Sequence, residues 1–169
     1  MCSRVDRDRH ACLLMVSERD PLYDAGHMDI PDIRRQLRHA LEQAKKDSAE
    51  RRARMDLAAI AYQAFLRDVA TPVFRMFANV VKAEGHAFAV FTPEGAVRVA
   101  SERHADDFME IYLDASLDPP QVATRVSRQR GRDLTMKEGL LRADAPIGGL
   151  TDEDVFAFLL GNIGPLVER

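Results

Sequence analysis

The sequence predicts an α+β fold, in which helices at both ends of the chain enclose an antiparallel meander of four to five strands. Two observations predict it. From Met55 to Gly85, apolar residues recur every three or four positions, which is the period of an α-helix. From Ala87 onward the apolar period shortens to two, as in strands with one buried face. A capped apolar segment near the C-terminus predicts a closing helix packed on the sheet.

The bulk composition is that of an ordinary globular chain. The 169 residues suit one domain, and 46% are hydrophobic while 30% are charged. A net charge of −3 gives no overall field that would attract nucleic acid or an anionic membrane, so such binding would need a local patch. No apolar run reaches the roughly 18 residues that span a bilayer. Cys2 and Cys12 suggest no disulfide framework, and we expect a cytoplasmic location.

Residues 1–28 follow neither period, and we expect a disordered leader or an upstream extension there. Whether residues 1–27 belong to the native protein stays open. The segment contains four side chains that could bind a metal, of which only two lie close in sequence, so zinc is not predicted. These side chains are Cys2, His10, Cys12 and His27.

A projecting helix is expected over 29–54, with Asp29 as its cap and Pro31 in its first turn. Its apolar stripe is narrow. The stripe consists of Ile33, Leu37, Ala40, Leu41 and Ala44. Because 47–54 is charged almost throughout, we expect a weak joint near Asp47, giving two helices or a helical hairpin in preference to one long rod.

A single α+β domain is predicted over 55–169, and it begins with a long kinked helix. Pro72 would cost about 3 kcal/mol inside a regular helix, yet the apolar stripe continues beyond it. We therefore expect a kink or a fresh start capped by Thr71, and a stop at Gly85. The stripe consists of Ile60, Ala64, Phe65, Val69, Val73, Met76, Phe77 and Val80.

Strands are predicted at 87–92, 96–101 and 108–114, with a tight turn at 93–95. The third strand alternates between an apolar face and a polar one. Met109, Ile111 and Leu113 share the first face, and Glu110, Tyr112 and Asp114 share the second.

The segment 118–131 admits two interpretations. Asp118 and the prolines after it could start a helix, but alternating β-branched residues after Gln121 favour a strand. A turn at Arg130–Gly131 and a last strand over 133–140 would follow. Thr151 then caps the final helix, with acidic residues in its first turn.

The common catalytic motifs of nucleotide-binding, zinc-dependent and serine enzymes are missing, so the sequence leans away from an enzyme and indicates no cofactor or metal. One acidic group with a neighbouring imidazole could act as an acid–base pair or bind a divalent cation if its members converged. A solvated loop is the favoured interpretation. The group consists of His104, Asp106, Asp107 and Glu110.

The region 125–142 is the most basic part of the predicted fold. On a hairpin, its arginines could face a nucleic acid. The alternative is that they pair across the sheet with Glu110 and Asp114. The residues that would contact nucleic acid are Arg125, Arg128, Arg130 and Arg132.

The leading hypothesis is a small, non-enzymatic, cytoplasmic protein that acts by protein–protein association. It would be a homodimer whose N-terminal helices reach across to a partner subunit, because the apolar surfaces exceed what one meander covers. Leu37, Leu41, Phe65 and Phe77 are the residues assigned to association or packing. Nucleic-acid binding through 125–142 is one alternative. A ligand or enzymatic pocket between sheet and helices, lined by Phe88, His104 and Tyr112, is another.

Overall fold

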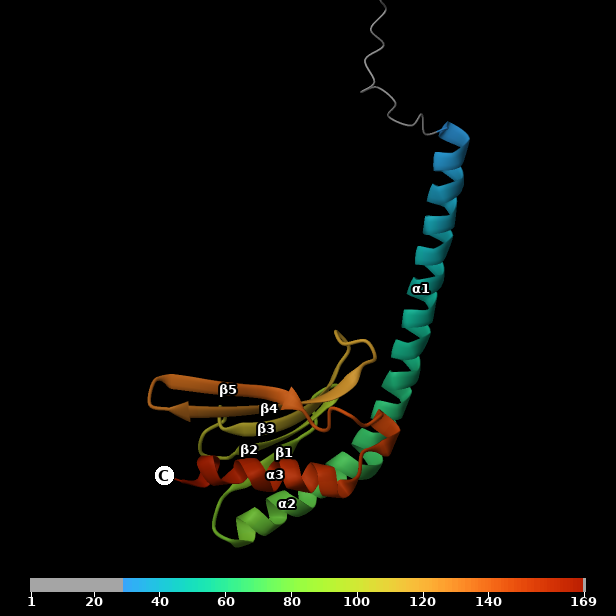
Figure 1. Ribbon diagram of the computed structural model, residues 1–169. Coiled ribbons are helices and arrows are strands. Elements are labelled where there is room, and N and C mark those ends of the chain that lie inside the picture. Colours follow the sequence, from blue (N-terminus) through green and yellow to red (C-terminus); the bar gives the residue numbers. More distant parts are fainter. Residues whose placement is uncertain (1–28, 169) are drawn as a thin grey trace, which may run out of the picture. The chain divides into compact units, whose positions relative to one another are not determined.

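The computed structural model describes residues 29–168 and confirms the α+β fold (Figure 1). A helical segment is followed by a five-stranded antiparallel sheet and a C-terminal helix. The chain forms two units, one extending to Glu42 and the other starting at Gln43. The expectation of a disordered leader over 1–28 lies outside the described residues.

Helix α1 runs from Ile30 to Phe65 without interruption, so the predicted joint near Asp47 and the helical hairpin are wrong. The stretch 47–54 lacks an apolar stripe, but α1 contains no glycine or proline after Pro31, and its residues favour helix. Side-chain pairs one turn apart support it. The Gln43 Nε2 amide donates to Asp47 Oδ1 at 2.8 Å, and Lys46 Nζ lies 3.9 Å from Glu50 Oε1.

The helical path continues past Pro72, as the apolar stripe predicted. A π-helical turn, Leu66–Ala70, links α1 to helix α2, Thr71–Ala83. The Thr71 N–H donates to the Leu66 carbonyl five residues back. Thr71 is not the expected cap, because its backbone is already helical (φ −62°, ψ −44°). The missing N–H of Pro72 falls in the first turn of α2, where it disrupts little.

The buried stripe differs from the predicted one. The π-helical turn accommodates more residues per turn than an α-helix, so the apolar phase shifts. Ile60, Met76 and Val80, which the 3.6-residue period placed on the buried face, are exposed. The side chains that are buried instead are Tyr62, Phe65, Ala70, Val73, Phe74, Phe77 and Ala78.

The sheet is a meander in the order β1-β2-β3-β4-β5, and every neighbouring pair is antiparallel. The 121–130 segment is a strand, as the β-branched pattern favoured. Gly95 and Gly131 adopt positive φ in the two tightest turns. The strands are β1 (Phe88–Phe91), β2 (Ala96–Ser101), β3 (Phe108–Asp114), β4 (Gln121–Arg130) and β5 (Asp133–Leu140).

Helix α3, Asp152–Val167, packs beside α2 on the same face of the sheet (Figure 1). Thr151 caps it as predicted: its hydroxyl accepts from the Asp154 N–H at 3.4 Å, and its own N–H donates to Asp154 Oδ2 at 3.0 Å. The core between helices and sheet is filled by apolar side chains. Those with no exposed surface include Phe74, Val97, Val99, Met109, Ile111, Val155 and Leu159. None of the described helices is long and apolar enough to cross a membrane.

Candidate functional site

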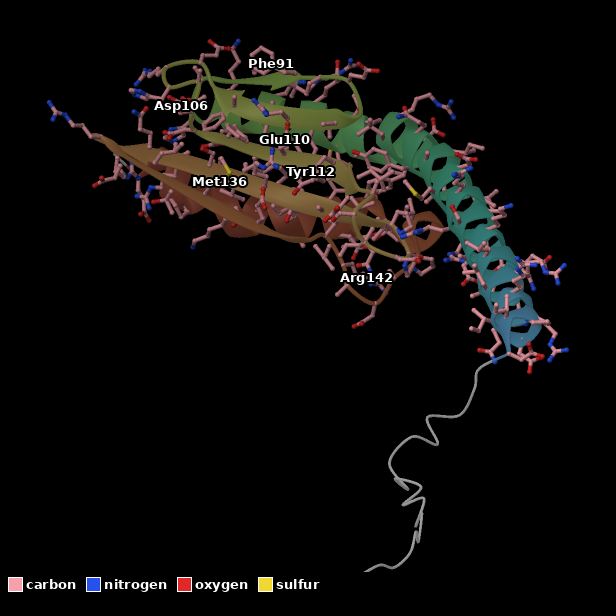
Figure 2. The ribbon with its side chains drawn as sticks, turned by 90° about the horizontal axis from the view of Figure 1, so that it is seen from above. Phe91, Asp106, Glu110, Tyr112, Met136 and Arg142 are labelled. Atoms are coloured by element: carbon pink, nitrogen blue, oxygen red, sulfur yellow. The ribbon has the colours of Figure 1, made fainter. Side chains whose placement is uncertain are left out.

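The sheet face opposite α2 and α3, called here the open face, carries a network of side-chain ion pairs. No described helix lies over this face, and Figure 2 looks directly on to it, with Glu110, Tyr112 and Met136 labelled. Strand alternation assigns its side chains. They include Phe91, Arg98, Phe108, Glu110, Tyr112, Arg125, Leu134, Met136 and Glu138.

A row of alternating charges crosses four strands of the open face. The register places Arg98 opposite Glu110, Glu110 opposite Arg125, and Arg125 opposite Glu138. Glu110 Oε1 accepts from Arg98 Nη2 at 2.8 Å, and its Oε2 accepts from Arg125 Nη1 at 3.3 Å. Arg125 Nε donates to Glu138 Oε1 at 2.8 Å, which raises the pKa of Arg125. The expected pairing with Glu110 is thus confirmed, whereas Asp114 instead accepts from Ser116.

Glu110 is buried although it lies on the open face. Its side chain is 5% exposed, whereas Arg98 and Arg125 are 33% and 31% exposed. Each guanidinium stacks on an aromatic ring: Arg98 lies 4.0 Å from the Phe108 centroid, and Arg125 lies 4.7 Å from that of Tyr112. Two arginines and two glutamates leave the row electrically neutral. It therefore offers no net charge for capturing an anion.

A recess of about 450 Å³ adjoins this row where α1 meets the sheet. Tyr62 lines this recess and is held in place there, because its hydroxyl donates to the carbonyls of Gly95 (3.1 Å) and Ile111 (3.3 Å). Burial, and then the negative charge of Glu110, raise the pKa of Tyr62. The phenol therefore stays protonated at neutral pH and serves as a hydrogen-bond donor, not as a base.

The four arginines proposed for nucleic-acid contact do not share one surface. Arg125 lies on the open face, where glutamates neutralise it. Arg128 and Arg130 point to the helix side by strand alternation, and Arg130 Nη2 donates to the carbonyls of Pro165 (2.6 Å) and Glu168 (2.7 Å). Arg132 lies in the turn after β4. The continuous basic ribbon that the nucleic-acid hypothesis requires is not formed by these residues.

The acidic group around His104 does not converge. Asp106 lies in the loop before β3, whereas Glu110 lies within the strand (Figure 2). Asp107 is buried and accepts from the Gln129 N–H at 2.7 Å, so its carboxylate holds β4 in place. Within residues 29–168, no cluster of three His, Cys, Asp or Glu side chains could hold a metal ion.

In the described chain, Phe88, His104 and Tyr112 do not line one common recess. Phe88 and His104 line one recess of about 250 Å³, and Tyr112 lines the separate recess beside Tyr62. The space between the two layers is occupied by the buried core described above.

The residues assigned to association or packing divide into two kinds. Phe65 and Phe77 are buried within the chain, where Phe65 contacts Tyr62 (ring centroids 6.3 Å apart). Leu37 and Leu41 are exposed and continue a row that begins at Ile30 and Ile33. Ile30, Ile33, Leu37 and Leu41, called here the α1 stripe, are between 41% and 63% exposed.

A second exposed apolar surface was not foreseen. Met76 and Val80 of α2, with Phe156 and Leu160 of α3, are 43–58% exposed. They border a cavity of about 410 Å³, called here the α2–α3 groove. The sequence contains the signal, since all four residues belong to predicted apolar helices. However, the shift at the π-helical turn places Met76 and Val80 outside the buried face, and in α3 the buried face is that of Val155 and Leu159, which leaves Phe156 and Leu160 exposed.

Comparison with known proteins gives no match: no family model, no curated protein and no solved structure is significantly similar to the chain. The open face has at its centre a neutral row of paired arginines and glutamates, with the buried Ser127 hydroxyl of the same face unpaired among the described residues, while the α1 stripe and the α2–α3 groove present apolar side chains to solvent. These two surfaces are among the exposed apolar features of the described chain, which also include Phe91, Leu134 and Met136 on the open face.

Proposed function

We propose that this protein is a non-enzymatic module that acts by protein–protein association and forms a homodimer through its N-terminal helix. The α1 stripe carries the proposal. Its four large apolar residues follow the spacing i, i+3, i+7, i+11, so they lie on one helical face, and each is about half exposed. Such a stripe is typical of a helix that packs against another protein surface.

The paired state of the polar groups supports a binding role over a catalytic one. Catalytic acids and bases converge on a substrate site with perturbed pKa values. Here the Glu110 carboxylate is held by two guanidiniums, and the Tyr62 hydroxyl is held by two carbonyls. A cytoplasmic location is part of the proposal. It rests on the two cysteines of the sequence, and cell fractionation would test it.

The free energy available from the α1 stripe can be compared with the cost of association. Fully burying a large apolar side chain contributes about 1.5–3 kcal/mol, so a half-exposed one contributes about 1 kcal/mol. Four such residues in each of two copies give about 8 kcal/mol. Association costs about 4–15 kcal/mol in lost freedom. Two stripes packed on each other would thus barely offset that cost, and a stable dimer needs further apolar surface.

The test replaces two stripe residues by charges. Leu37→Glu with Leu41→Glu should abolish self-association, because two carboxylates would be desolvated in each interface. Gln36→Glu with His39→Glu adds two acidic residues to exposed positions of the same helix outside the stripe and should leave association unchanged. Sedimentation velocity over 1–300 µM, with circular dichroism to verify helix content, measures both.

We expect wild type and the Gln36/His39 variant to reach the dimer mass and the Leu37/Leu41 variant to remain a monomer. A wild-type chain that stays monomeric over this range would overturn the proposal. So would a Leu37/Leu41 variant that dimerises as wild type does.

A further inference from the structure

The α2–α3 groove is a preformed channel between two helices that run in the same direction. Phe77, at the middle of α2, and Phe156, in the first half of α3, contact edge to face at a centroid distance of 6.4 Å. His86 and Val167, which follow or end the two helices, line the groove together at its other end. The side chains that border the groove are apolar except for Glu84 and His86 at one end, which is the form that accepts an amphipathic helix.

We infer that the α1 stripe of one copy docks in the α2–α3 groove of a second copy. This inference rests on the proposed self-association and names the surface to which the N-terminal helix reaches. Reciprocal docking, with each copy giving one stripe and receiving the other, closes the assembly as a two-fold dimer. The occupant is thus a second copy of this chain.

The lengths of the two surfaces agree. The stripe runs from Ile30 to Leu41, and the α3 wall of the groove runs from Phe156 to Val167. Each interval is eleven residues, which at a rise of about 1.5 Å per residue spans about 16 Å. A helix laid along the groove would therefore place every residue of the stripe over apolar surface.

The charges at the two surfaces are complementary. Arg34 and Arg38 flank the stripe on one side and are exposed. Glu84 lines one end of the groove, and Asp152 and Glu153 stand exposed in the first turn of α3 at the other end. Arginines beside the docked stripe would therefore meet carboxylates at the rim, which favours correct encounter and register.

The area is sufficient for a stable dimer. Each half-exposed apolar side chain has roughly 30–60 Å² of apolar surface left to bury. Reciprocal docking covers both stripes and both grooves, or sixteen such side chains, which gives roughly 500–1,000 Å² of apolar area. Because apolar atoms make up about 60% of an interface, the total is roughly 800–1,700 Å². Stable interfaces begin near about 1,000 Å², and packing one stripe on the other would bury only half as much.

Substitution of a residue that lines the groove tests the docking site separately from self-association itself. Leu160→Glu should raise the dimer dissociation constant at least about tenfold, because it places a charge under the docked stripe. Ala157→Glu adds the same charge to an exposed position of α3 that does not line the groove, and should leave dissociation unchanged. Leu160 is exposed, so the fold should tolerate the change, and circular dichroism would verify this.

Cross-linking then locates the contact. In a chain carrying Cys2→Ser and Cys12→Ser, copies with Leu37→Cys are mixed with copies carrying either Val80→Cys or Ala157→Cys, and a short bismaleimide is added. We expect a covalent dimer joining positions 37 and 80, and little joining 37 and 157.

Three results separate the outcomes. A wild-type monomer would overturn both self-association and the groove assignment. A dimer that Leu37→Glu with Leu41→Glu disrupts but Leu160→Glu does not would overturn the groove assignment alone. Cross-linking between two copies of Leu37→Cys, with none from position 37 to position 80, would likewise show that the stripes pair with each other and overturn the assignment.

Discussion

Replacing Glu110 by glutamine tests how much the charged row of the open face stabilises the fold. The carboxylate accepts from Arg98 Nε (3.0 Å), Arg98 Nη2 (2.8 Å) and Arg125 Nη1 (3.3 Å), and glutamine keeps the shape while removing the charge. Hydrogen bonds to a charged group contribute about 1.5–3 kcal/mol each. Two arginine partners would give about 3–6 kcal/mol, but both are about one-third exposed and water replaces part of the loss. We expect a net destabilisation of about 2–3 kcal/mol.

Urea unfolding followed by circular dichroism at one protein concentration measures this loss. With a slope of about 2 kcal/mol/M, the midpoint should fall by about 1–1.5 M at unchanged slope. Glu138→Gln is the matched control, because among the described residues Glu138 is paired with Arg125 alone, and its side chain is 52% exposed. It should cost at most about 1 kcal/mol. If Glu110→Gln were as stable as Glu138→Gln, the burial of Glu110 would have no energetic consequence and the reasoning would fail.

Two further changes test single contacts. Tyr62→Phe removes the hydroxyl that donates to the Gly95 and Ile111 carbonyls, and should cost about 1–2 kcal/mol and lower the melting temperature by about 3–6 °C; an unchanged melting temperature would contradict this. Asp154→Ala should cost about 1 kcal/mol at pH 7 through loss of the helix cap. Because the Thr151 N–H lowers the pKa of Asp154 below 3.8, the unfolded chain binds this proton first, so wild-type stability should fall as pH drops below about 4. Urea midpoints at pH 7 and pH 3 should show a smaller fall for Asp154→Ala, and equal falls would refute the assignment.

The strands of this fold could be read from the sequence because local signals agree there. Alternation, β-branched residues and glycine turns mark β2, β3 and β5 with the boundaries that the structure shows. The cap of α3 was equally visible, because Thr151 and the acidic first turn are local features.

The helical half was less predictable. A polar segment such as 47–54 can be a linker or an exposed helix, and only the helix propensity of α1 as a whole decides between the two. The π-helical turn has no signature in the 3.6-residue period. Tyr62 before it and Phe74 after it are both buried in the core, and packing of this kind depends on residues distant in sequence.

The polar contacts depended on register, which the sequence leaves open. Glu110 meets Arg98 and Arg125, which lie 12 and 15 residues away, only because β2, β3 and β4 pair in one alignment. A shift of one residue would move the carboxylate to the core side. Likewise, the sequence could not show that Arg130 donates to carbonyls at the end of α3 instead of joining a basic surface, because this contact links segments distant in the sequence.

The simple strand order has a consequence for the nascent chain. Each hairpin can close as soon as its second strand leaves the ribosome, since every pairing joins segments adjacent in the sequence. The aliphatic side of Val97 and Ile111, however, stays incompletely sheltered until α3 has been synthesised. Premature termination before Thr151 would therefore release a paired sheet with an exposed aliphatic surface. Such a chain would bind chaperones or aggregate.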